Sequence, residues 1–207
     1  MKFAPLCLGL LTLGVGLAGC GGLIPPPQAD PTHYYVLTGP PLADSDAVAT
    51  GRLRLGLKAV ELAAYLKSPG LIVRQGTNEL MLQDYARWGE PLDAGIARIL
   101  RERLRTAAAV ARVYPQPFPL DADRDYDVAV SVWRCEGGTA AGRRVAQFAA
   151  TIEITTTGMN ARVVARRTFV APPASWDGRD FAQLAALLSA EVDALGQEVV
   201  AALPAAP

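Results

Sequence analysis

Apolar and polar residues alternate along several short segments of the chain, which is typical of strands with one buried face. The clearest case is residues 52–58, where Leu53, Leu55 and Leu57 fall on one face. Similar patterns predict further strands over residues 34–37, 71–74, 79–82, 110–114, 126–136, 145–156 and 161–171. We expect a hairpin at the turn around residues 76–78 and another at residues 158–160, since turn-forming residues separate the strands there.

Two longer segments repeat apolar residues every three or four positions, as amphipathic helices do. The first follows Pro91, which suits the start of a helix because its missing N–H would have no partner there. Its apolar stripe comprises Leu92, Ile96, Ile99, Leu100, Leu104 and Ala107. The second helix is expected over about residues 178–202, with an apolar stripe of Phe181, Leu184, Leu188, Val192, Leu195 and Val199. On that helix we expect Glu191, Asp193 and Glu198 to be solvated.

These elements predict a single α/β domain over residues 33–207. A mixed sheet of about six to eight strands would be covered by the two amphipathic helices. Residues 40–51 are expected to form a polar loop between strands. Trp176 is expected to staple the start of the second helix.

The N-terminus has the pattern of a secretory signal. Lys2 precedes an apolar run over residues 3–18, which is shorter than the roughly 20 residues that span a bilayer. The run ends in Leu17-Ala18-Gly19-Cys20, which is similar to the bacterial lipobox. We therefore expect residues 1–19 to be a lipoprotein signal peptide and Cys20 to carry lipid. The alternative is an ordinary secretory signal with an incidental cysteine.

After cleavage the chain would have 188 residues and begin with a proline-rich stretch. Residues 20–32 include three consecutive prolines, which favour an extended, semi-rigid tether. Gly21, rather than aspartate, follows the lipidated cysteine, and resemblance to the enterobacterial sorting rule then favours the outer membrane.

Composition excludes several classes of function. The 20 basic and 20 acidic side chains leave no positive excess, so nucleic-acid binding is not expected. His33 is the only histidine, which argues against a serine-histidine-aspartate triad or a histidine-based zinc site. Cys135 lies in a predicted strand and is interpreted as a packed core residue. We expect no enzyme activity, no cofactor and no metal.

Four alternating aspartates before a predicted strand admit two interpretations. Asp121, Asp123, Asp125 and Asp127 have a spacing that could bind calcium, but the glycine and distal glutamate of an EF-hand loop are missing. We favour a solvated turn.

Several ordered segments resemble the ABC-type transport auxiliary lipoprotein family, the PqiC (YmbA-like) group. They are Tyr34-Tyr35-Val36-Leu37, residues 53–60, residues 65–74, Asn78-Glu79-Leu80 and residues 87–92. Within residues 65–74 the segment has the family's Tyr-Leu pair, then a proline, then an apolar strand ending in arginine. Ala64 departs from the family, which often has proline before Tyr-Leu. The resemblance covers about residues 20–202.

The resemblance implies a lipid-anchored periplasmic subunit of an intermembrane phospholipid-transport system. Its partners would be an MCE-domain protein and the inner-membrane transporter subunits, and the lipoprotein would dock the conduit at the outer membrane. A homo-oligomer would suit that role. Partner-binding residues are predicted to be Tyr65, Leu66, Pro69, Gly70, Arg87 and Trp88. Alternatively, Tyr65, Leu66 and Trp88 plug the edge of the core.

Two other functions remain open at the level of sequence. One is an envelope scaffold or assembly lipoprotein, such as a cell-wall synthase activator or a secretin pilot, because a fold does not determine a function. The other is a secreted hydrolase.

Overall fold

The computed structural model describes residues 29–39 and 51–204. The described residues form two helices, α1 (Leu92–Arg105) and α2 (Phe181–Ala202), and one 3-10 turn, η1 (Ala64–Lys67). The strands are β1 (His33–Tyr35), β2 (Leu53–Leu57), β3 (Glu61–Leu62), β4 (Gly70–Arg74), β5 (Leu80–Trp88), β6 (Val110–Pro115), β7 (Tyr126–Ala140), β8 (Arg143–Thr156), β9 (Val163–Val170) and β10 (Ala174–Ser175).

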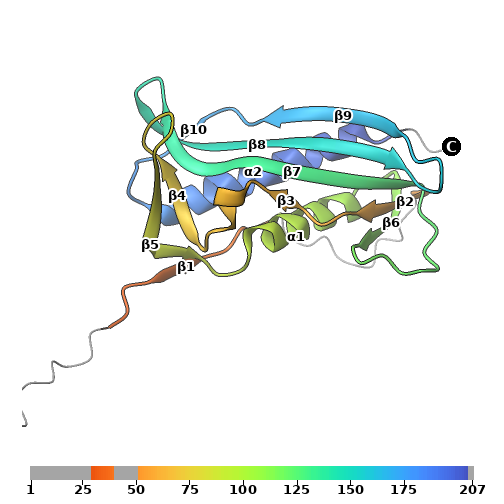
Figure 1. The fold of residues 1–207 in the computed structure, drawn as a ribbon, viewed down its shortest axis with the longest axis horizontal. Helices are drawn as coiled ribbons and strands as arrows, with labels where there is room; N and C mark the ends of the chain where they lie inside the picture. The colour runs from red at the N-terminus through yellow and green to blue at the C-terminus, as the bar shows by residue number, and fades with distance from the viewer. Residues whose placement is uncertain (1–28, 40–50, 205–207) are drawn as a thin grey trace, which may run out of the picture. The chain divides into compact units, whose positions relative to one another are not determined.

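Within residues 29–39 and 51–204 the ten strands form one mixed sheet organised around the long strand β7 (Figure 1). On one side β7 pairs antiparallel with β8, and β8 pairs antiparallel with β9 and β10. On its other side β7 pairs in succession with β2, β3 and β4, all parallel to it. Beyond these, β6 pairs with β2, β5 pairs with β4, and β1 pairs with β5.

The predicted α/β class, the two helices and both hairpins are confirmed. Ten strands exceed the expected six to eight, because β3 and β10 have two residues each and are too short to produce a recognisable alternation. Strand β5 also continues to Trp88, well beyond its expected end at residue 82. Residues 40–50 of the expected loop lie outside the described part of the chain.

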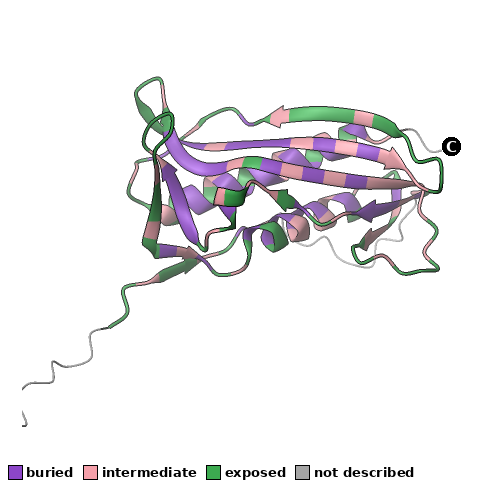
Figure 2. Cartoon of the chain, in the orientation of Figure 1, coloured by how far each residue is buried: buried purple, intermediate pink, exposed green. Residues whose placement is uncertain are grey.

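Both helices cover one face of the sheet, and the core lies between (Figures 1 and 2). The predicted apolar stripes supply it, and Leu53, Ile96, Leu188 and Val192 are all at most 1% exposed. Cys135 is buried in β7, as expected, and burial raises the pKa of its thiol. Among the described residues, no helix is both long and apolar enough to cross a bilayer.

One expectation about α2 is wrong, since Glu191 is not solvated but only 6% exposed. Glu191 lies seven residues after Leu184 and three after Leu188, so helical periodicity places it on the buried stripe. Neither of its carboxylate oxygens has a hydrogen-bond partner among the described residues. Burial raises the pKa of Glu191 to about 7. By contrast, Asp193 forms an ion pair with Arg103 of α1.

Candidate functional site

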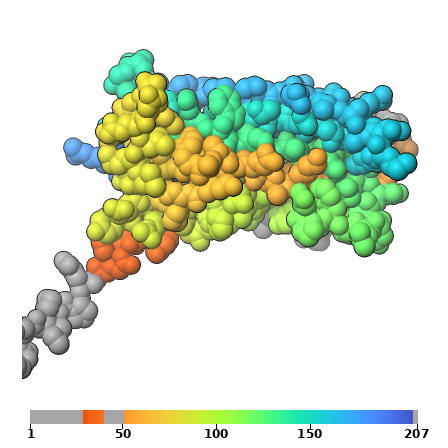
Figure 3. Space-filling view, viewed as in Figure 1, coloured from red at the N-terminus to blue at the C-terminus, as the bar shows by residue number. Residues whose placement is uncertain are grey.

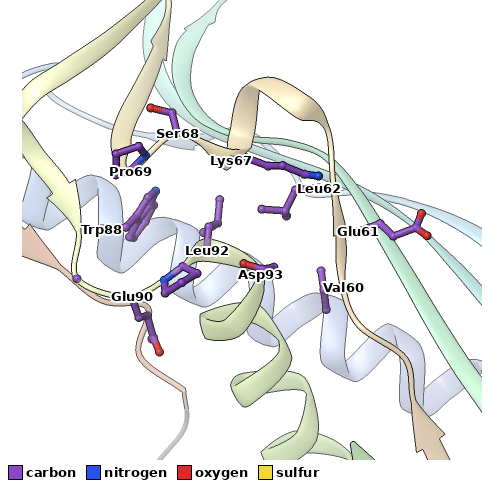
Figure 4. A pocket seen from close by; sticks show the side chains of 12 residues that line it. Val60, Glu61, Leu62, Lys67, Ser68, Pro69, Trp88, Glu90, Leu92 and Asp93 are labelled. Carbon is purple, nitrogen blue, oxygen red and sulfur yellow. The ribbon is translucent and has the colours of Figure 1, made fainter. Parts of the chain in front are cut away.

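A cleft of about 810 Å³ opens between the β3–η1 segment and the connection from β5 to α1 (Figure 4). In the space-filling view, the orange β3–η1 segment meets the yellow and yellow-green residues of β5 and α1 at the surface (Figure 3). The cleft is lined by Val60, Glu61, Leu62, Lys67, Ser68, Pro69, Trp88, Gly89, Glu90, Pro91, Leu92 and Asp93.

The apolar part of the cleft is formed where β5 ends and α1 begins. Strand β5 ends at Trp88, whose N–H donates to the carbonyl oxygen of Pro69 at 2.8 Å. Three residues later Pro91 precedes α1 at the N-cap position. Trp88 and Leu92 are 8% and 5% exposed and form the floor, while Leu62 is half-buried and faces them (Figure 4).

The mouth of the cleft carries three carboxylates and one ammonium group. Glu90 forms an ion pair with Arg98 at 2.5 Å, and Glu61 accepts a hydrogen bond from the Ser131 hydroxyl at 3.1 Å. Asp93 and Lys67 form no ion pair within the described residues. With Glu90 neutralised by Arg98, the mouth keeps a net charge of −1, which favours a cationic group on a ligand.

A second cluster lies around Glu136 of β7, which is fully buried. Its carboxylate oxygens contact Arg74 at 2.5 and 3.3 Å, and Arg134 lies 3.6 Å away. The Arg74 guanidinium also lies 5.7 Å from the centre of the Tyr65 ring, and the Tyr65 hydroxyl donates to the carbonyl oxygen of Trp133. Burial, with a contribution from the nearby Glu136 charge, raises the pKa of Tyr65 to about 12. These contacts stabilise the outer face of the sheet and place no nucleophile or base in a cavity.

Pro69 and Trp88 are the two predicted partner-binding residues that meet at the cleft. Tyr65 belongs instead to the cluster around Glu136. The hydrogen bond from the Trp88 N–H to the carbonyl oxygen of Pro69 brings the end of β5 next to the segment that follows η1. Tyr65 lies in η1 itself.

The remaining predicted residues are placed differently. Leu66 is 1% exposed and is part of the core. Gly70 is also buried, and a Cβ at this position would lie 2.6 Å from the carbonyl oxygen of Gln83 on β5. Arg87 is half-buried, and its Nε donates to the carbonyl oxygen of Asp84. Cys20 lies outside the described residues.

Three of the four alternating aspartates form ion pairs, and the last of them, Asp127, lies within β7. Asp123 and Asp125 each form an ion pair with Arg54 at 3.2 Å, and Asp127 pairs with Arg124 at 2.9 Å. Within the described parts of the chain, no three histidine, cysteine or acidic side chains are grouped to hold a metal ion.

Sequence reasoning missed the part that Leu62, Asp93 and Glu136 play. Strand β3 is too short to show a pattern, and Asp93 resembles any solvated residue of a first helical turn. The signal for Glu136 was its position within a long strand, directly after the buried Cys135, but a β-bulge between residues 132 and 134 changes the facing there.

The fold and these sites define a class of protein: a small α/β domain in which two helices cover one face of a mixed sheet and a surface cleft opens beside strand β3. The chain belongs to the family of ABC-type transport auxiliary lipoprotein components, whose model matches residues 35–200. This is a family of transport auxiliary lipoproteins and not of enzymes. No curated protein matches the sequence.

Solved structures share the fold at low sequence identity. Protein XCC0632 from Xanthomonas campestris, of family DUF330, superposes with a TM-score of 0.68 and 22% identity, covering 82% of this chain and 93% of that one. A second crystal structure of an uncharacterized protein superposes with a TM-score of 0.64 and 14% identity, covering 82% of this chain and 97% of the other. Both likenesses establish the fold alone.

Proposed function

We propose that this protein is the lipid-anchored periplasmic auxiliary subunit of an intermembrane phospholipid-transport system of the ABC/MCE type. It docks the transport conduit at the outer membrane and performs no catalysis. Residues 1–19 are the signal peptide, Cys20 carries lipid, and residues 20–32 tether the domain of residues 33–207. The match of the family model to residues 35–200 carries this proposal.

The physical demands of lipid transfer agree with such a role. Acyl chains exposed to water cost about 0.8 kcal/mol per CH₂, so a lipid needs a sealed path across the periplasm. A path of that kind needs a fixed end at the receiving membrane. Two or more acyl chains on one cysteine hold a protein domain at a membrane stably, and a compact domain beyond a proline-rich tether can then contact the conduit.

The anchor is tested by fractionating cells that express the full chain, Cys20→Ala or Cys7→Ala. We expect the wild type and Cys7→Ala in the outer-membrane fraction, because Cys7 lies within the proposed signal. Cys20→Ala should leave that fraction. Retention of Cys20→Ala in the outer membrane would contradict the proposed anchor.

The partner is tested by affinity purification of the tagged full chain from detergent-solubilised envelopes. An MCE-domain protein should be recovered with the wild type. Recovery of a cell-wall synthase or a secretin in its place would identify an envelope scaffold or assembly lipoprotein and would contradict the transport role.

A further inference from the structure

Strand β3 has an edge that pairs with no other described strand. Its neighbours along β7 are covered on that side, β2 by β6 and β4 by β5, whereas β3 pairs with β7 alone. The Ala63 N–H donates to the carbonyl oxygen of Val132 at 2.9 Å. Because successive strand residues direct their backbone groups to opposite edges, the N–H and C=O of Leu62 point away from β7. Leu62 also lines the cleft, and its side chain is drawn there in Figure 4.

Both ends of this edge are closed by hydrogen bonds. At one end the Ala59 N–H donates to Oε1 of Gln116, which follows β6, at 3.0 Å. At the other end the carbonyl oxygen of Pro69 accepts from the Trp88 N–H at 2.8 Å. The open edge is therefore confined to the stretch at Leu62, and the cleft lies directly beside it.

The surroundings of the open edge are complementary to one kind of ligand. Trp88 and Leu92 provide an apolar floor next to Leu62, and the mouth keeps a net charge of −1, with the Asp93 carboxylate unpaired among the described groups. A free strand edge offers a main-chain donor and acceptor, the apolar floor takes a side chain, and Asp93 suits a basic group.

We propose that the cleft binds an extended polypeptide segment of a partner protein, which adds a strand to β3. The segment pairs its main chain with Leu62, places an apolar side chain against Trp88 and Leu92, and directs a lysine or arginine toward Asp93. This inference deepens the proposed function and rests on it for the partner's identity, but the binding chemistry stands on the cleft itself. An anionic lipid headgroup would meet the net negative mouth and would leave the Leu62 donor and acceptor without a matched main chain.

The main-chain pairing is tested with a displayed library of random nine-residue peptides selected against the full-length protein. We expect enrichment of sequences with alternating apolar and basic residues. Leu62→Pro lacks the N–H that points away from β7 but retains the Ala63–Val132 bond, so it should bind the enriched peptides roughly tenfold more weakly than Leu62→Ala. Absence of enrichment, or equal binding to both variants, would overturn the inference.

The charge preference is tested with a second pair of variants, which does not depend on the folding of Leu62→Pro. Asp93→Lys reverses the charge at the cleft, and Asp121→Lys makes the same change at an exposed residue outside it. Asp93→Lys should weaken peptide binding about tenfold, while Asp121→Lys should leave it unchanged. An equal effect of the two substitutions would mean that Asp93 does not bind a basic residue of the peptide.

Different results test peptide binding in the cleft and the transport role. If the wild type, Leu62→Pro and Asp93→Lys all recover an MCE-domain protein equally well, the proposed binding in the cleft would be contradicted. The transport role would still stand. If peptide binding depends on the β3 edge but no MCE-domain protein is recovered, binding in the cleft would stand and the transport role would be contradicted. Displacement of the peptides by vesicles of anionic phospholipid, or a wild-type oligomer that Leu62→Pro dissociates, would identify lipid or a second copy as the occupant and overturn the inference.

Discussion

Two buried carboxylates in this protein have opposite surroundings. Glu136 lies on the outer face of the sheet, where Arg74 contacts both of its oxygens and Arg134 lies nearby. Glu191 lies on the buried stripe of α2, and its oxygens have no hydrogen-bond partner among the described residues. Glu136 is buried with partners for both oxygens, whereas burial without a partner favours the protonated form of Glu191. The two residues should therefore affect stability in different ways.

Replacing Glu136 with alanine should lower the free energy of unfolding by about 3 kcal/mol, because it leaves the Arg74 guanidinium partly buried without its carboxylate. Urea denaturation of the purified protein measures the change. The matched control is Glu153→Ala, which removes an exposed ion pair with Arg166 between β8 and β9 and should cost no more than about 1 kcal/mol. Equal losses in the two variants would refute the buried-pair account.

Glu191→Gln should remove a pH dependence of stability. The pKa of Glu191 is raised to about 7 in the folded protein, so the folded state binds more protons than the unfolded state between about pH 4.5 and 7. Wild-type stability therefore has an unfavourable contribution that grows as pH rises through this window. The nearby Cys135 thiol does not titrate there, because burial raises its pKa.

The variant should equal the wild type at pH 4.5 and exceed it by roughly 1–3 kcal/mol at pH 8. Urea denaturation at several pH values measures the difference. Glu198→Gln on the same helix, where Glu198 pairs with Arg167 at 2.6 Å, is the control and should retain the wild-type pH profile. Parallel profiles for wild type and Glu191→Gln would show that Glu191 is ionised in the folded protein.

At the scale of elements, the contact between β7 and the start of α2 depends on a glycine, Gly137, which has no side chain. A Cβ on Gly137 would lie 2.7 Å from Cζ3 of Trp176 and 3.3 Å from Cδ2 of Leu184. Trp176 in turn donates through its indole N–H to the carbonyl oxygen of Asp180, and its ring lies 5.6 Å from that of Phe181. Trp176 thus contacts the start of α2, as the sequence predicted, and Gly137 makes room for it.

Gly137→Ala should lower the free energy of unfolding by about 1–3 kcal/mol, because the added methyl group forces Trp176 away from β7. The change is measured by urea denaturation followed by tryptophan fluorescence. Gly76→Ala is the matched control, since a Cβ at Gly76 has no neighbour within 4 Å, and its stability should be close to wild type. A wild-type stability for Gly137→Ala would mean that the ring moves freely.

At the scale of the whole molecule, the sheet is continuous on one side of β7 and interrupted on the other. Strands β2, β3 and β4 line up along β7, but only the outer two carry a further strand. The interruption leaves a strand edge beside an apolar cleft, and unpaired edges of this kind are where other chains pair.

Hydrogen exchange should detect this interruption directly. The Ala63 amide, bonded to Val132, should exchange at least roughly tenfold more slowly than the Leu62 amide, whose N–H points away from β7. Residue-resolved exchange by NMR makes the comparison within one protein, so the two neighbours control for local unfolding. Equal protection would show that another group covers the edge.

The sequence by itself determined what depends on local periodicity. The alternation of Leu53, Leu55 and Leu57 and the stripes of the two helices predicted the α/β class, because each pattern reports which face of one element is buried. The ordered Tyr-Leu and Arg-Trp segments carried the resemblance to the family, which the family model then matched over residues 35–200.

Only the tertiary structure decided which edges of the sheet are covered and which polar groups are buried with partners. The pairing of β3 with β7 alone, the meeting of Pro69 with Trp88, and the contact of Arg74 with Glu136 each join residues distant in sequence. Local patterns do not encode such contacts, because they arise from the way that whole elements pack. The cleft beside Leu62 exists for that reason.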